Sequence, residues 1–205
     1  PLCKRLIFSP DYYQAIAHPR AALVTDRIAR IEPAGIRTND GVLHELDIIV
    51  FATGFKSDQF MRPMQITGQH GITLEDLWAQ RPKAYLAISM PGFPDFFMLN
   101  APNGPVGNFP LIDISEHQWQ YIARLMERLR SGECSEISVS REALEKFETE
   151  RIAAAKTTVW FTGGCRSWYL DAEGIPSSWP WDYQRFVEEM REPDWSAYTM
   201  GPPGP

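Results

Sequence analysis

The chain has 205 residues, of which 44% are hydrophobic and 22% charged, and its formal net charge is -6. This composition is typical of a folded globular protein and excludes a largely disordered chain. The acidic balance, without a run of lysines or arginines, argues against a nucleic-acid partner, and no apolar stretch is long enough for a membrane span. The length suits one large domain or parts of two.

Three cysteines, Cys3, Cys134 and Cys165, are widely spaced and form no CxxC motif. An odd number at such spacing argues against a disulfide scaffold and against a zinc site. We therefore expect no metal, and we expect a protein of the reducing cytoplasm. The chain opens on Pro1 rather than Met and runs directly into strand-like sequence, which suggests a segment cut from a longer polypeptide.

Residues 20–55 are predicted to be rich in β-strand. The stretch AALVT at 21–25 is strand-like, and Asn39-Asp40-Gly41 between two strand-like flanks marks a hairpin turn. The run DIIVFA at 47–52 is apolar on both faces, which is typical of a buried strand in a parallel sheet. It stops at Thr-Gly, which suits either a plain turn after a core strand or a close approach of backbone to a ligand.

The middle of the chain is predicted to be largely irregular. Residues 56–84 contain one short helix near LEDLWAQ, residues 74–80. Two strand candidates, Tyr85–Ile88 and Phe96–Leu99, frame a Pro-Gly turn, and a loop rich in proline, glycine and asparagine follows.

A strong helix is predicted over residues 113–131. Its apolar residues recur at helical spacing, Asp113 or Ser115 can serve as the N-cap, and Gly132 ends it.

A second helix is predicted at about 141–155, introduced by Ser140 with an acidic residue in its first turn. The stretch that follows, residues 157–186, holds four of the seven tryptophans. It is too apolar for a free tail, so we expect it to fold onto the rest of the protein.

Three stretches, in this order along the chain, resemble the C-terminal part of the Baeyer-Villiger and related flavin-containing monooxygenases. They are CKRLIFSPDYYQAI at 3–16, DIIVFATGF at 47–55, and GFPDFFMLNAPNGPVGNF at 92–109 with the helix after it. TVWFTGGCRSWYLD at 158–171, together with WPW, resembles the closing segment of one subgroup.

The resemblance implies an α/β fold with incomplete parts of two dinucleotide-binding, Rossmann-like domains, a β-meander and C-terminal helices. Residues 1–55 would be the C-terminal part of the NADP-binding domain, and residues 56–205 that of the FAD-binding domain. Neither GxGxxG fingerprint occurs in the sequence, and the pair Gly104 and Gly107, flanked by prolines, does not replace it. The missing N-terminal half of the same enzyme is therefore an expected partner.

The resemblance also implies roles for three residues near the nicotinamide. Arg5 is the catalytic candidate, because a guanidinium stays charged and can hold a peroxide oxygen and the nicotinamide amide in turn. Lys4 would face the 2′-phosphate of NADPH. Trp160 matches a tryptophan near the nicotinamide and substrate, and its indole N–H could donate to a ribose or phosphate. The structural alternatives are solvated cations for the first two and a core residue for the third.

Two further places are implied to contact a cofactor. Thr53 and Gly54 would lie where the chain crosses between the two domains. The loop before the 113–131 helix would face the flavin, because a helix start is a positive end that suits the anionic pyrimidine of reduced flavin. Its candidate residues are Asn103, Gly104, Asn108 and Phe109. An ordinary loop with a helix cap is the alternative.

The implied function is a monooxygenase that uses FAD and NADPH to insert one atom of O2 into a ketone through a C4a-peroxyflavin. This chain would be its C-terminal portion and inactive alone. An N- or S-oxygenating enzyme is the alternative within the class, and a truncated non-catalytic fragment or interaction module is the alternative outside it. The segment GGCRSWY at 163–169 replaces the Gly-Ala-Asn of other members, so the substrate class stays open.

Overall fold

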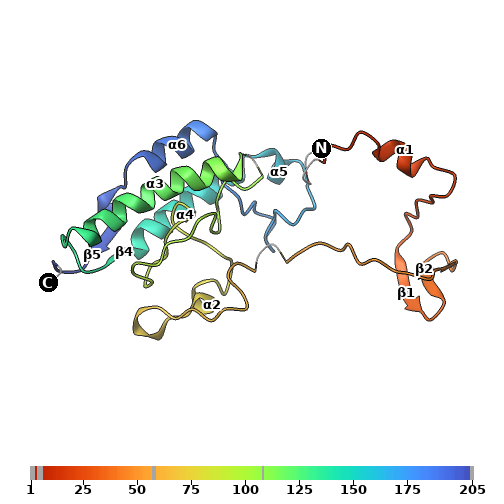
Figure 1. The fold of residues 1–205 in the computed structure, drawn as a ribbon, viewed down its shortest axis with the longest axis horizontal. Helices are drawn as coiled ribbons and strands as arrows, with labels where there is room; N and C mark the ends of the chain where they lie inside the picture. The colour runs from red at the N-terminus through yellow and green to blue at the C-terminus, as the bar shows by residue number, and fades with distance from the viewer. Residues whose placement is uncertain (1–2, 4–6, 57–58, 108, 204–205) are drawn as a thin grey trace. The chain divides into compact units, whose positions relative to one another are not determined.

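The structure is a computed structural model that describes residues 3, 7–56, 59–107 and 109–203. The chain divides into two compact units, Leu6–Lys56 and a larger one that joins Pro1–Arg5 to Ser57–Pro205. The smaller unit is mainly strand and extended chain, and the larger unit is mainly helical (Figure 1). The mixed α/β character expected from the sequence is confirmed, with small antiparallel sheets in place of a complete parallel sheet.

The smaller unit contains one short helix and a three-stranded antiparallel meander. Its elements are α1 (Tyr12–Ile16), β1 (Ile28–Glu32), β2 (Gly35–Thr38) and β3 (Leu43–Glu45), with β2 in the centre. The hairpin predicted at Asn39-Asp40-Gly41 is confirmed. Gly41 takes a φ of 88°, and its N–H donates to the Thr38 carbonyl at 3.0 Å.

Two strand predictions in this unit are wrong. Residues 21–25 form no strand, and neither do residues 47–52, whose side chains are largely exposed. The exposed fraction of Val50 is 82%. A strand with two apolar faces needs neighbouring strands and a covering layer, and no strand in the described part of the chain pairs with this segment. The apolar pattern alone therefore does not produce a strand.

The larger unit consists of three long helices, several short elements and one two-stranded antiparallel ribbon. Its elements are η1 (Gln69–Gly71), α2 (Leu74–Leu77), α3 (Leu111–Arg130), β4 (Ile137–Val139), α4 (Arg141–Ala155), α5 (Val159–Thr162), α6 (Tyr183–Arg191), η2 (Trp195–Ala197) and β5 (Tyr198–Met200). Helix α3 packs against α6, and β4 pairs with β5 (Figure 1).

One hydrophobic core joins the three long helices. The fully or almost fully buried side chains that form it include Ile114, Tyr121, Ile122, Leu125, Leu144, Phe147, Trp179, Phe186 and Met190. The later part of the aromatic stretch 157–186, with Trp179 and Phe186, thus folds onto the helices as predicted, whereas Val159, Phe161 and Trp168 in its first part are exposed. A second, smaller cluster surrounds α2 and includes Leu74, Trp78, Met90 and Phe93.

Helix α3 lies where the sequence predicted it but starts two residues earlier. It begins at Leu111 after Pro110, and neither Asp113 nor Ser115 caps it. Proline fixes φ near -65° and has no N–H to leave unpaired, so it is well suited to the start of a helix. The predicted end is confirmed, because Gly132 follows the helix with a φ of 77°.

Two other helices agree with the prediction. Helix α4 begins after Ser140, whose hydroxyl oxygen accepts a hydrogen bond from the Ala143 N–H at 3.1 Å. The short helix α2 begins at a capping box formed by Thr73 and Asp76.

The strand candidates Tyr85–Ile88 and Phe96–Leu99 are wrong. Leu86 and Ala87 take positive φ values of 51° and 58°, which turn the chain back on itself and are incompatible with a strand. The two segments still lie side by side, since an N–H at residue 98 donates to the carbonyl of residue 88 at 2.9 Å.

Cys3 and Cys165 form a disulfide bond across a sequence separation of 162. The spacing of the cysteines argued against a disulfide scaffold, and it gave no indication of this bond. Spacing along the sequence does not restrict residues that the tertiary fold brings together, and here the two Cα atoms lie 5.2 Å apart. Cys134 is free and buried.

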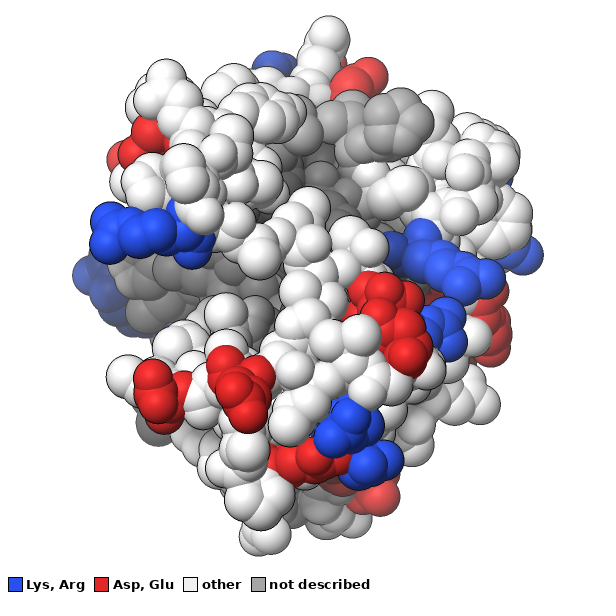
Figure 2. All heavy atoms as spheres, turned by 90° about the vertical axis from the view of Figure 1, so that its right-hand side faces the viewer, with Lys and Arg blue, Asp and Glu red and all other residues white. Residues whose placement is uncertain are grey.

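The described surface carries charges of both signs. On the face drawn in Figure 2, Lys and Arg side chains are interspersed with Asp and Glu. Within the described ranges, no helix has both the length and the hydropathy for crossing a membrane. The same residues contain no group of His, Cys, Asp and Glu arranged to hold a metal ion.

Candidate functional site

The loop that precedes α3, residues 100–110, is fixed to the protein through Asn103. This side chain is buried, its Oδ1 accepts from the Ala84 N–H at 3.1 Å, and its Nδ2 donates to the Ser177 carbonyl at 3.1 Å. Asn103 also takes a φ of 72°, a conformation that asparagine tolerates better than most residues. Its polar atoms are engaged within the chain, so Asn103 holds the loop in place.

The two glycines of this loop have different surroundings. Gly104 is buried, and its carbonyl accepts from the Trp179 N–H at 3.1 Å. Gly107 is exposed with a φ of 89°, and a Cβ there would lie 2.9 Å from the Tyr169 hydroxyl oxygen. The loop therefore reaches the surface at Gly107, where both the conformation and the approach of Tyr169 require a glycine.

Residues 169–179, here called the strap, hydrogen-bond to this loop at Asn103 and Gly104. The Arg151 guanidinium of α4 donates to the Pro176 carbonyl of the strap at 2.8 Å. It also pairs with Glu148 at 2.6 Å, and both of these side chains are buried. Helix α4 thus fixes the strap, and the strap fixes the loop through Asn103.

Trp160 of α5 reaches the same region through an aromatic stack. Its ring lies parallel to that of Tyr169, with 6.0 Å between the centroids and an interplanar angle of 11°. Trp168 stacks on Tyr169 as well, at 3.9 Å. Because Tyr169 also lies against Gly107, the structure brings Trp160 and the loop before α3 to one region.

The start of α3 carries a polar cluster that the sequence did not predict. The Tyr183 hydroxyl of α6 donates to the Asp113 carboxylate, and this hydrogen bond raises the pKa of Tyr183. His117 Nε2 lies 3.3 Å from the Tyr183 oxygen and 3.9 Å from Asp113 Oδ1. Phe109 meets the Tyr183 ring edge to face, with centroids 5.0 Å apart. The cluster fixes the first turn of α3 to α6 beside the loop.

The sequence indicated the proximity of only two members of this cluster. Asp113 and His117 are four residues apart on a helix, so they share a face. Tyr183 is 70 residues further along than Asp113, and no local pattern connects the two.

Thr53 and Gly54 belong to the smaller unit and are exposed, and Gly54 takes a φ of 90° with open space around its Cα. Lys4, Arg5 and Asn108 lie outside the described residues. Of the predicted residues that the structure describes, Asn103, Gly104, Phe109 and Trp160 lie in the larger unit, around the loop before α3 and Tyr169.

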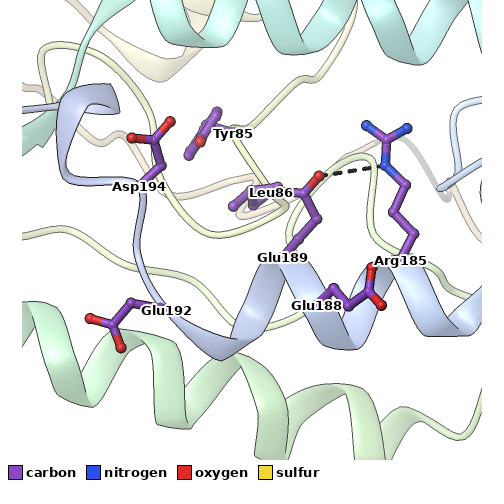
Figure 3. A pocket seen from close by; sticks show the side chains of 7 residues that line it. All are labelled: Tyr85, Leu86, Arg185, Glu188, Glu189, Glu192 and Asp194. Carbon is purple, nitrogen blue, oxygen red and sulfur yellow. Dashed lines mark ion pairs between the residues drawn. The ribbon is translucent and has the colours of Figure 1, made fainter.

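A separate hollow of about 360 Å³ lies between α6 and the segment around Tyr85. Figure 3 shows its lining, which consists of Tyr85, Leu86, Arg185, Glu188, Glu189, Glu192 and Asp194. The single guanidinium is turned toward Glu189, with which it forms an ion pair at 3.4 Å. Four carboxylates against one arginine make this hollow unfavourable for a phosphate group.

Comparison with known proteins identifies relatives of the whole chain. An uncharacterised monooxygenase of Mycobacterium tuberculosis is 48% identical over 180 residues, which are 88% of this chain and 36% of the relative. A Baeyer-Villiger monooxygenase of Streptomyces coelicolor is 32% identical over 205 residues, which are 99% of this chain and 40% of the relative. No protein-family model matches the chain.

Solved structures agree with these relatives. Cyclohexanone monooxygenase from a Rhodococcus species, bound to NADP+, matches with a TM-score of 0.82 at 28% identity, over 98% of this chain and 39% of that one. Oxidised steroid monooxygenase bound to NADP matches with a TM-score of 0.84 at 25% identity. The chain spans little more than a third of the length of the relatives it matches. It is homologous to the C-terminal part of the Baeyer-Villiger and FAD-binding monooxygenases.

Proposed function

We propose that this chain forms part of an enzyme that uses FAD and NADPH to insert one oxygen atom of O2 into a ketone. The reaction consumes ketone, O2, NADPH and a proton, and it yields an ester or lactone, water and NADP+. Similarity to NADP-bound cyclohexanone monooxygenase over 98% of the chain carries the proposal. Bound FAD would supply the activation of O2, which amino-acid side chains do not provide.

The start of α3 is the described part of the chain that best fits a flavin. No described side chain caps this helix, and the N–H groups of a first helical turn have no acceptor within the helix. Leu111 and Ile112 in this turn are exposed and offer apolar contact to a ring system. The partial positive charge of the helix start favours negative charge nearby by about 0.3–1 kcal/mol at an exposed site. The donor set therefore fits an electron-rich heterocycle.

In this proposal the loop residues divide into two groups. Asn103 and Gly104 are buried and committed to the chain, so they act as positioning residues that set where the loop runs. Phe109 and the exposed Gly107 lie nearer the helix start and would contact a cofactor. Asn108 remains a prediction.

Trp160 would cover the nicotinamide side of the site. Its ring lies parallel to that of Tyr169, which orients the indole for contact with a flat ligand ring. Thr53 and Gly54 would allow close backbone approach where the chain joins the two units.

Lys4 and Arg5 keep the roles that the resemblance implies. The Lys4 ammonium would pair with the 2′-phosphate of NADPH, and the Arg5 guanidinium would neutralise negative charge that develops on oxygen during insertion. Removal of one such fixed donor commonly lowers turnover by about 100- to 1,000-fold.

Isotope-labelled turnover distinguishes ketone from heteroatom oxygenation. The enzyme that contains this chain is supplied with NADPH, 18O2 and equal amounts of a cyclic ketone and a dialkyl sulfide. We expect a lactone that carries one 18O atom. Sulfoxide as the sole product would favour the S-oxygenating alternative, and a protein with bound FAD that forms neither product would refute oxygenation of both substrates.

The role of Arg5 has its own test. In Arg5→Ala we expect NADPH still to reduce the bound flavin while lactone formation is lost. Arg20→Ala, an exposed arginine of the smaller unit, is the matched control and should keep normal turnover. Normal lactone formation by Arg5→Ala would remove this residue from the mechanism.

The non-catalytic alternative is tested on the chain alone. Because both GxGxxG fingerprints are absent from the sequence, we expect the purified chain to show no stoichiometric flavin absorbance. A yellow protein with one flavin per chain would contradict this expectation.

A further inference from the structure

The Cys3–Cys165 disulfide joins a largely exposed segment to the first residues of the chain. Cys165 lies in residues 163–168, here called the clasp loop, between the end of α5 and the strap. Most of the clasp loop is exposed, and a Cβ added to Gly164 would meet nothing within 4 Å. Beyond Cys165, backbone hydrogen bonding resumes at Ser167, whose carbonyl accepts at 3.1 Å from the residue three positions on. Among the described contacts of this loop, the disulfide is a covalent one, and Trp168 adds a stacking contact with Tyr169 at 3.9 Å.

The clasp loop connects the two members of the aromatic stack. Trp160 precedes the loop in α5, and Tyr169 follows it directly. Tyr169 also lies against Gly107 of the loop before α3. A covalent link at Cys165 restricts the conformations of the clasp loop, and so the positions that the two rings can take relative to each other.

Cys3 and Cys165 are more accessible to a reductant than Cys134, which is buried. Cys3 and Cys165 are partly exposed, and Arg166 follows Cys165 while two basic residues follow Cys3 in the sequence. Disulfide exchange proceeds through a thiolate, which a basic environment favours. Burial, in contrast, raises the pKa of the Cys134 thiol and keeps it unreactive.

We propose that the Cys3–Cys165 disulfide is a redox-sensitive clasp that holds the clasp loop and the Trp160–Tyr169 stack in place, so that its reduction weakens binding of NADP(H). The link to NADP(H) rests on the proposed function, whereas the ordering of the loop does not. Reduction releases the loop, lets the stack open and adds an ordering cost to binding.

The redox step balances with a small thiol as the reductant. Two RSH molecules donate two electrons and two protons to the S–S bond, which becomes two cysteine thiols, while the reductant leaves as one RSSR. A small-molecule disulfide reverses the reaction. The small thiol and its disulfide supply all the electrons and protons of this exchange, so the step needs no metal or flavin.

Hydrogen exchange of the oxidised and the dithiothreitol-reduced protein tests the clasp. We expect faster amide exchange in residues 163–169 after reduction, and little change in the middle of α3. Cys3→Ser should exchange like the reduced protein under both conditions. Cys134→Ala retains the disulfide and should respond to reduction as the parent does. Equal exchange rates in the oxidised and reduced protein would overturn the clasp.

Titration with NADP+ tests the functional link on the FAD-loaded enzyme that contains this chain. We expect the dissociation constant to rise roughly fivefold on reduction, at the low end of couplings between linked sites, and to be insensitive to redox state in Cys3→Ser. Faster loop exchange with an unchanged dissociation constant would overturn the link to NADP(H). Failure of the oxidised enzyme to bind NADP+ at all would count against the proposed function, and the exchange data would still decide the clasp.

Discussion

The buried pair formed by Arg151 and Glu148 should be essential to the larger unit. The side chains are 1% and 9% exposed, and the guanidinium donates to the carboxylate at 2.6 Å and to the Pro176 carbonyl at 2.8 Å. In Glu148→Gln the positive charge stays buried but loses its counter-ion. Removing one partner of a buried pair typically costs about 3–5 kcal/mol. At a urea m-value of about 2–3 kcal/mol/M, this lowers the unfolding midpoint by roughly 1–2.5 M.

A surface pair with the same geometry provides the control. Glu127 and Arg130 of α3 are also three residues apart and 2.6 Å distant, but their side chains are 57% and 77% exposed. Water replaces the lost partner at such a site, so Glu127→Gln should leave the urea midpoint unchanged within error. Urea unfolding of both variants, followed by circular dichroism at 222 nm, compares them directly.

The double variant Glu148→Leu with Arg151→Met separates charge from packing. Apolar replacement of a whole buried pair is often close to neutral, although the Pro176 carbonyl would lose its donor. Its midpoint should therefore lie between those of the parent and Glu148→Gln. Equal midpoints for Glu148→Gln and the surface control would refute the view that desolvation makes this pair important.

Three further changes have defined outcomes. Gly107→Ala places a Cβ 2.9 Å from the Tyr169 hydroxyl at a φ of 89°, and we expect a loss of about 1–3 kcal/mol in urea unfolding; a neutral result would mean that the loop shifts freely. Ser140→Ala removes the α4 cap, which should cost about 1 kcal/mol while Ser140→Thr retains most of it; equal melting temperatures would exclude capping. Burial raises the pKa of Tyr198 to about 12, above its ordinary value of about 10. The unfolded state therefore loses this proton first, and stability present below pH 10 declines as the pH rises toward 12, by up to about 1.4 kcal/mol per pH unit. Urea midpoints at pH 9 and 11 should differ less in Tyr198→Phe than in the parent, and an equal decline would assign the effect to other groups.

Features that depend on local interactions could be predicted from the sequence. The hairpin at 39–41, the start of α4 at Ser140 and the end of α3 at Gly132 each rest on contacts within a few residues, so composition and spacing were enough. The start of α3 was misplaced because two good capping side chains, Asp113 and Ser115, compete with a proline that has no side-chain signal.

The candidate site could be predicted only in part. Sequence resemblance pointed to the loop before α3 and to Trp160, which the structure brings to one region through Tyr169. It could not show that the Asn103 amide is fully engaged within the chain, because its partners at residues 84 and 177 come from distant segments.

The sequence by itself determined the helices with clear caps, the hairpin and the relationship to flavin monooxygenases, because motif order and short-range spacing are properties of the linear chain. The tertiary structure alone decided that residues 47–52 form no strand, that Cys3 meets Cys165, and that Tyr183 joins Asp113. Each of these depends on which partners reach a residue in space. Burial and pairing are properties of the folded molecule, and local pattern does not specify the partner.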